Sequence, residues 1–330
     1  MNVPIEVKFP DIERWKRGRV AAPGERALPW VWTYAAPIAG PHVCVTALVH
    51  GNEVCGAIAA DALLDALESG LRPQRGRLSV VFANVEAYRR FDAARPFASR
   101  AVDEDFNRLW DGATLDGARD SIELRRAREL RPFFDGVDHL LDLHSMQEPA
   151  PPIALAGDTE KGLALARALA MPEHILVDSG HKAGKRLRDY ADFGAAERSR
   201  SALLIECGQH WEANVGNVAR QATLRFLEHF EVCDHAALQR LGRGLAPVPR
   251  STQRVIDITA VVTVRSAGFR WRRPLRGLEV IAEAGTSIAL DGDTDVRTPH
   301  ADAVMVMPSP EPKVGQTAVR IGRVRAMTAA

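Results

Sequence analysis

Apolar runs alternate with stretches of helical periodicity along the first two thirds of the chain. A continuous apolar run predicts a strand that is buried on both faces, and apolar positions every three to four residues predict an amphipathic helix. The predicted strands cover 42–49, 78–84, 138–144, 152–156 and 202–207, and the predicted helices cover 53–70, 120–134, 160–170 and 213–241, the last as one long helix or two. This alternation predicts an α/β fold with a mixed, mostly parallel sheet and helices on both faces.

The pattern changes after residue 244. The segment 244–253, GLAPVPRSTQ, carries two prolines among polar residues and is typical of a linker. Short β-type runs separated by Gly, Pro and Asp follow it, without helical periodicity. We therefore expect two domains: an α/β catalytic domain over 1–245 and a small all-β domain over 251–330.

Composition narrows the class of protein. The 330 residues are 46% hydrophobic and 26% charged, with a formal net charge of +1, so no global field favours nucleic acid or an anionic membrane. No apolar run has the length of a membrane span, and the N-terminus lacks the apolar centre of a signal peptide. Four cysteines without Cys-x-x-Cys spacing argue against a thiolate zinc site. We expect a cytoplasmic protein, and the sequence leaves homo-oligomerisation open.

Polar side chains stand at the ends of several predicted strands. His50, Asn84, His144 and Glu206 each lie at or next to such an end. Ligands of open α/β sheets bind at the carboxyl ends of the strands. These four residues are far apart in the sequence, and the fold predicts that they meet at one edge of the sheet.

Two histidines and a carboxylate among these residues have the composition of a catalytic zinc site. His50 and Glu53 straddle a strand-to-helix turn, and His144 could supply a third ligand, which leaves one position open for water. Zinc lowers the pKa of such a water to about 7 and makes hydroxide available as a nucleophile. Asp142 shares a strand face with His144 and could hold the second ring nitrogen of a ligand. The alternatives are a solvated pair at a helix start and, for Asp142, a capping residue.

Glu206 ends an apolar strand, where a carboxylate is costly to bury without a purpose. It could act as a general base, or it could pair with a neighbouring arginine. The segment 99–110 carries Arg100 and Arg108, and guanidinium groups bind carboxylates in a bidentate manner or polarise a carbonyl. The alternative for this segment is an exposed loop with internal ion pairs.

Five motifs in order resemble the succinylglutamate desuccinylase/aspartoacylase family, which is related to the zinc carboxypeptidases. They are VHGNE (49–53), N-x-x-A (84–87), R-x-V-D-x-D-x-N-R (100–108), DLH (142–144) and IECG (205–208). The resemblance implies a carboxypeptidase-like fold and a C-terminal β-domain. It also implies site roles: one zinc ion per chain on His50, Glu53 and His144, Glu206 as base, Arg100 at the oxyanion, Asn107 with Arg108 on the substrate carboxylate, and Asn84 lining the site.

The chain departs from aspartoacylase at Ser145-Met146 and at Ala196, where that enzyme has a substrate-binding arginine; here Arg198 and Arg200 lie nearby. We therefore expect a zinc-dependent amidohydrolase that removes an acyl group from an N-acyl amino acid or a similar small amide. The alternatives are a zinc carboxypeptidase acting on peptides and a non-catalytic zinc-binding or small-molecule-binding module. A further polar stretch either borders the pocket or is a solvated loop; it contains His181, Lys182, Lys185 and Arg186.

Overall fold

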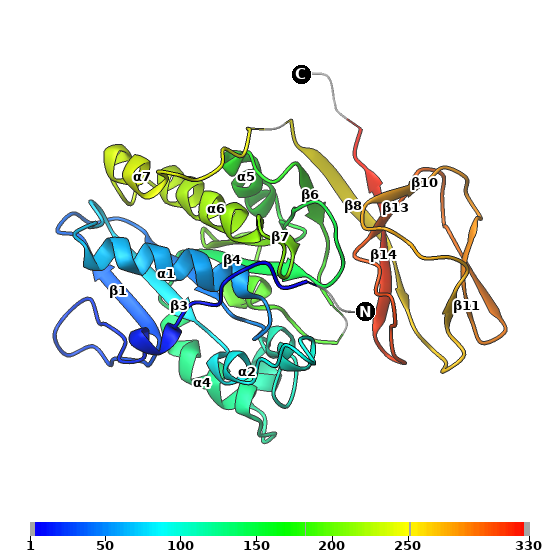
Figure 1. Cartoon of the computed structure of the whole chain (residues 1–330), viewed down its shortest axis with the longest axis horizontal. Coiled ribbons are helices and arrows are strands. Elements are labelled where there is room, and N and C mark those ends of the chain that lie inside the picture. Colours follow the sequence, from blue (N-terminus) through cyan, green and yellow to red (C-terminus); the bar gives the residue numbers. More distant parts are fainter. Residues whose placement is uncertain (1–3, 182, 251, 327–330) are drawn as a thin grey trace.

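The computed structural model describes residues 4–181, 183–250 and 252–326. Lys182 lies outside the described residues. Within these residues, eleven strands form one large sheet, and Figure 1 labels its two edge strands, β1 and β10. In spatial order they are β1 (Val31–Ala35), β3 (Arg77–Phe82), β2 (His42–Ala47), β4 (His139–Met146), β7 (Ser201–Gln209), β5 (Ile153–Leu155), β6 (His174–Val177), β8 (Arg254–Thr263), β14 (Thr317–Val324), β13 (Ala303–Val306) and β10 (Glu279–Ile281).

The centre of the sheet is parallel, as the sequence predicts. β3, β2, β4 and β7 run parallel to one another, while β1 and β5 are antiparallel to their neighbours β3 and β7. Val43, Cys44 and Val45 of β2 are fully buried, which is why this strand has a continuous apolar sequence. The sequence did not predict β1 or β6, because each is a short run of four or five residues.

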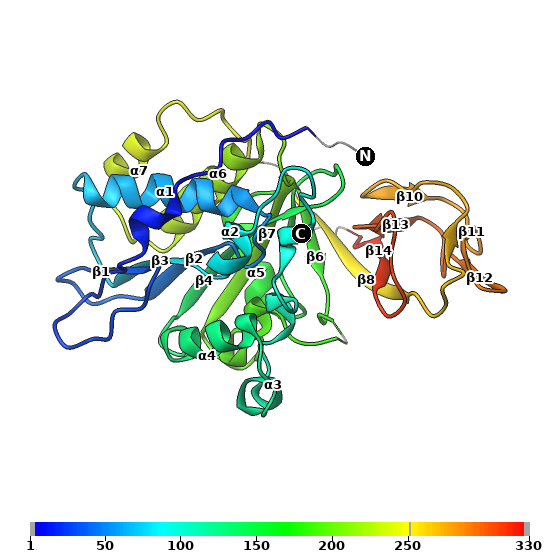
Figure 2. The same cartoon turned by 60° about the horizontal axis from the view of Figure 1, so that its bottom comes forward.

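Helices cover both faces of the parallel part of the sheet. They are α1 (Val54–Glu68), α2 (Val85–Arg89), α3 (Gly112–Asp116), α4 (Ile122–Phe134), α5 (Glu160–Leu169), α6 (Val215–His229) and α7 (His235–Leu241). Figure 2 shows α1 and α6 on one face and α4 on the other. Leu141 and Leu143 of β4 pack with α1 and α6, whereas Leu140 packs with α4, as the twofold period of a strand requires. None of the helices in the described part of the chain has the length and apolarity that a membrane crossing requires.

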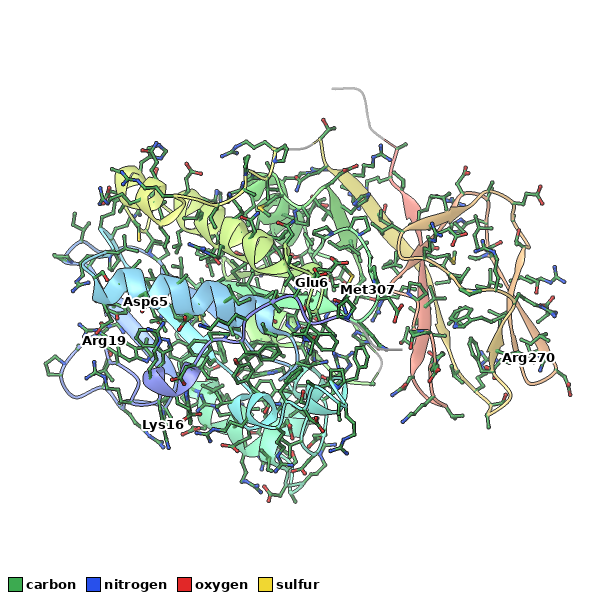
Figure 3. All side chains as sticks on the ribbon, viewed as in Figure 1. Glu6, Lys16, Arg19, Asp65, Arg270 and Met307 are labelled. Carbon is green, nitrogen blue, oxygen red and sulfur yellow. The ribbon has the colours of Figure 1, made fainter. Side chains whose placement is uncertain are left out.

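The C-terminal region consists of strands, as expected. β8 pairs in parallel with β6, so β8, β14, β13 and β10 continue the main sheet beyond its α/β part. A second sheet contains β12 (Thr294–Arg297), β11 (Ser287–Asp291) and β9 (Arg270–Trp271). Met307 packs against an apolar cluster that joins both regions, with Leu176 of β6, Ile256 of β8 and Val306 of β13. Figure 3 labels Met307 at this junction and Arg270 near the far end of the C-terminal strands.

Candidate metal and catalytic site

Three adjacent parallel strands, β2, β4 and β7, deliver the predicted site residues to one edge. His50 and Glu53 follow β2, and Glu53 immediately precedes the first residue of α1. His144 of β4 lies directly opposite Glu206 of β7 in the strand pairing. The sheet therefore brings together the four residues that the sequence assigned to metal and base.

A glycine shapes the turn that carries His50. A Cβ at Gly51 would lie 2.3 Å from the carbonyl carbon of Ala87 and 2.4 Å from the carbonyl oxygen of Ser99. The Gly51 amide also donates to the carbonyl of Arg100 over 3.1 Å. A side chain at this position would thus separate the His50 turn from the segment that carries Arg100.

Both imidazoles direct their Nδ1 atoms at one carboxylate. His50 Nδ1 lies 2.8 Å from Glu53 Oε1, and His144 Nδ1 lies 2.8 Å from Glu53 Oε2. One ligand atom from each of the three residues lies within 4.8 Å of the other two, and all three residues are buried. This is the donor set of a catalytic zinc site, namely two imidazoles and one carboxylate.

Each histidine also has a carboxylate at its other nitrogen. His50 Nε2 lies 2.9 Å from Asp105 Oδ1, and His144 Nε2 lies 3.0 Å from Asp142 Oδ2. The contact between His144 and Asp142 is short, but its geometry is not that of a hydrogen bond. Neither Asp142 oxygen has a hydrogen-bond partner in the described chain. Carboxylates in this position orient metal-ligating histidines and make them more basic. We predicted this role for Asp142 from the sequence and missed Asp105, although Asp105 lies within the motif at 100–108.

The carboxylates around His50 and His144 favour a positive charge at these imidazoles. Burial opposes ionisation of Glu53, but the two imidazoles outweigh it and hold the pKa of Glu53 well below its usual range. Burial likewise opposes charge on His144, but Asp142 and Glu53 outweigh it and raise the pKa of His144. Buried carboxylates that stabilise a cation on the imidazoles would also stabilise a divalent metal ion there. The residues present therefore fit the implied zinc ion.

Glu206 has the environment of a proton-transfer group. Its side chain is buried, and Oε2 has no hydrogen-bond partner among the described residues. Burial, followed by the negative charge of Glu53, raises the pKa of Glu206 to about 8. A bound divalent cation would oppose this shift and bring the pKa toward the working range of a general base.

Arg100 lies at the end of the 3-10 helix η2 (Ala98–Arg100), beside the donor set. Its Nη1 donates to Glu53 Oε1 over 3.0 Å, and its Nη2 donates to Asp105 Oδ2 over 3.1 Å. The side chain as a whole remains 42% exposed. The structure thus places Arg100 beside His50 and Glu53, and its expected role at the oxyanion stays a prediction.

Asn84 and Asn107 are buried, and both use their side chains within the protein. Asn84 Oδ1 accepts from the Ala87 amide, and its Nδ2 donates to Glu123 over 3.0 Å. Glu123 in turn accepts the backbone amides of residues 102–104, so Asn84 supports the segment that follows Arg100. Asn107 Oδ1 accepts from the Leu187 amide over 2.7 Å. Their predicted role in substrate binding stays a prediction.

Arg108, at the end of η3 (Phe106–Arg108), has cationic neighbours. Its Nη2 lies 3.8 Å from Asp105 Oδ2 and 3.1 Å from His181 Nε2. Burial lowers the pKa of Arg108 to about 10; Asp105 opposes the shift, whereas Arg100 and Arg320 add to it. An anion bound beside Arg108 would stabilise this buried guanidinium, because it would offset the burial and the neighbouring positive charges.

The polar segment after β6 contains both buried and exposed side chains. His181 contacts Arg108, and Arg186 is buried with its Nη2 2.7 Å from Asp178 Oδ1. By contrast, Arg198 is 67% exposed, with its Nε 3.7 Å from Asp192 Oδ1. Arg320 of β14 also reaches His181, over 2.8 Å, and no motif in the sequence pointed to this residue.

A cavity of about 320 Å³ lies away from these residues. It is lined by side chains that include His42, at the start of β2, whereas His50 follows the other end of that strand. Within the described part of the chain, the group of possible metal donors is His50, Glu53 and His144, which lie outside this cavity. The donor chemistry at the strand ends therefore identifies the candidate site, and cavity size does not.

Comparison with known proteins agrees with the fold. Residues 39–230 match the model of the succinylglutamate desuccinylase/aspartoacylase catalytic domain, so the chain belongs to this family. Solved structures that share its fold include succinylglutamate desuccinylases from Vibrio parahaemolyticus (17% identity, 90% of this chain and 86% of that chain, TM-score 0.65) and Chromobacterium violaceum (18%, 92% and 90%, 0.64). A product-bound ectoine utilization protein from Ruegeria pomeroyi is also similar (16% identity, 90% and 89%, TM-score 0.62).

Proposed function

We propose that the protein is a zinc-dependent amidohydrolase that removes an acyl group from an N-acyl amino acid or a similar small amide. The observation that carries the proposal is Glu206, a buried carboxylate opposite His144 in the strand pairing, with one oxygen that has no partner among the described residues. A site that only bound a metal would not require this costly group.

His50, Glu53 and His144 would hold the metal, with Asp105 and Asp142 orienting the two imidazoles. A divalent zinc ion in such a site supplies Lewis acidity, which polarises a carbonyl and activates water. Glu206 takes a proton from the attacking water and returns it to the departing amine. Arg100 donates to the carbonyl oxygen as negative charge develops on it.

Arg108, with Asn107 beside it, binds the carboxylate of the amino-acid half of the substrate. Support comes from the cationic surroundings of Arg108, which an anion would relieve. We further propose that residues 1–245 form the catalytic domain and that residues 251–330 shape the pocket without taking part in proton transfer.

Metal analysis and a panel of N-acyl amino acids test the proposal. We expect stoichiometric zinc in the wild type and release of free amino acid from at least one compound of the panel. His144→Ala should lose the metal while the fold survives, because the large apolar core does not depend on the ion. Stoichiometric zinc in that variant would refute the ligand set. Hydrolysis of peptides but of no N-acyl amino acid would identify a carboxypeptidase instead.

A further inference from the structure

An arginine from the C-terminal strands reaches the loop beside the candidate site. Arg320 of β14 is 6% exposed, and its Nη2 lies 2.8 Å from His181 Nδ1. Arg320 Nη2 also lies 2.5 Å from His181 Nε2, and Arg108 Nη2 lies 3.1 Å from that same nitrogen. The ring of His181 therefore contacts two guanidinium groups that come from distant parts of the chain.

Carboxylates do not balance this cluster. Asp178 bonds Arg186 over 2.7 Å and lies 3.5 Å from Arg320 Nε. Asp189 is shared between Arg186 and Arg188, with 2.6 Å to each. Among the described residues, three buried arginines thus share these two carboxylates, and Arg108 contacts neither of them.

Asp105 does not restore the balance. It lies 3.8 Å from Arg108 and already contacts His50 and Arg100. Buried positive charge without a counter-charge is costly, and an anion would lower that cost.

His181 is a poor partner for two cations. A neutral imidazole has one acceptor nitrogen with a single lone pair, so it cannot satisfy donors from both guanidinium groups. Burial, followed by Arg108 and Arg320, lowers the pKa of His181 to about 2, which keeps the ring neutral. In addition, Arg320 Nε has no hydrogen-bond partner in the described part of the chain. A carboxylate offers two charged oxygens and would satisfy the donors that the imidazole leaves unpaired.

We propose that Arg320 and Arg108 together form the subsite for the substrate carboxylate, and that His181 occupies it until the substrate displaces the ring. The subsite adjoins the metal donors, because Asp105 lies 3.8 Å from Arg108 and 2.9 Å from His50. The inference rests on the proposed function and makes a residue of the β-rich region determine specificity.

Binding of a substrate analogue that cannot be hydrolysed tests the subsite. The probe is N-methanesulfonylglycine, with its carboxamide as the uncharged partner, titrated calorimetrically into the zinc-loaded full chain. The wild type should bind the acid more tightly than the carboxamide. Arg320→Gln should lower affinity for the acid about tenfold or more, because a charge-assisted hydrogen bond contributes about 1.5–3 kcal/mol. Its affinity for the carboxamide should change little.

Arg323→Gln is the matched control, since Arg323 is exposed on the same strand and its loss removes the same charge. His181→Ala should bind the acid at least as tightly as the wild type. A loss as large as that of Arg320→Gln would make the ring a ligand and refute its displacement. Equal affinity for the acid in the wild type and Arg320→Gln, or no preference for the acid in the wild type, would overturn the subsite.

Arg320→Lys covers the case in which Arg320→Gln does not fold. Lysine keeps the charge but lacks the planar fork, so the preference for the acid over the carboxamide should fall severalfold and not vanish. An unchanged preference would overturn the subsite. Failure of the proposed function is a separate result: a wild type that hydrolyses no N-acyl amino acid would refute the activity, whatever the titrations show.

Discussion

Asp105→Asn tests whether the carboxylate behind His50 tunes the metal site. The structure gives Asp105 two short contacts, 2.9 Å to His50 Nε2 and 3.1 Å to Arg100 Nη2. Asparagine keeps an oxygen that can accept from His50, but it removes the charge that makes the imidazole more basic. Replacing such a partner typically lowers metal affinity about 10- to 100-fold. We expect Asp105→Asn to lower zinc affinity about 10-fold and Asp105→Ala to lower it about 100-fold. The two variants should therefore differ by about 1.4 kcal/mol in the free energy of zinc binding.

Competition with a chromogenic zinc chelator measures these affinities. Asp103→Asn is the control, because Asp103 is exposed in the same loop and accepts the Ile122 amide, away from His50. Thermal unfolding of each zinc-loaded variant checks that the loop keeps its fold. Wild-type zinc affinity in Asp105→Ala would show that Asp105 does not support the ligand, and the 2.9 Å contact would then be a structural ion pair only.

Three other predictions follow from the site and its surroundings. Glu206→Gln should keep zinc but lose about two to four orders of magnitude in kcat, measured with the best N-acyl amino acid; turnover at the wild-type rate would give Glu206 another role. Arg108→Ala should mainly raise KM and Arg100→Ala should mainly lower kcat, because only the oxyanion is confined to the transition state; the same pattern in both variants would contradict the two assignments. Burial lowers the pKa of His139 in the folded protein to about 4, so His139 adds stability above its unfolded pKa of about 6.5 that is lost as the pH falls toward 4. Urea unfolding at pH 7 and pH 5 should therefore show a smaller loss of stability for His139→Asn than for the wild type, and equal losses would rule this contribution out.

The sequence predicts best the features that depend on local pattern. The runs around β2, β4 and β7 are apolar because both faces of these strands are buried, and that property is visible in the sequence itself. The position of the metal donors follows from the same pattern, since His50 and His144 lie at the ends of parallel neighbours. Runs of three to five residues carry little periodic signal, so β5 was predicted from its apolar run while β1 and β6 were missed.

Contacts across long sequence separations could not be predicted. Asp105 reaches His50 over 55 positions, and Arg320 reaches His181 over 139. Asp105 at least stands in a motif rich in polar residues. Arg320 stands in AVRIGRV, where an arginine flanked by apolar residues is indistinguishable from an exposed residue of an alternating strand. Only the pairing of the strands shows that its side chain is buried.

The register of β14 decides where that side chain lies. Arg320 pairs with Val261 of β8, and the pairing shifts by one residue between Ile321 and Gly322, as in a β-bulge. A Cβ at Gly322 would lie 2.4 Å from Ile256 Cγ2, so the close approach of the two strands beyond the bulge requires glycine. Because a slip of one residue moves a side chain to the other face of a sheet, this irregularity sets the face on which Arg320 stands. β8 in turn pairs with β6, and Asp178 directly follows β6. The pairing of β6, β8 and β14 thus positions Arg320 beside His181 in the same way that the pairing of β4 with β7 positions His144 beside Glu206.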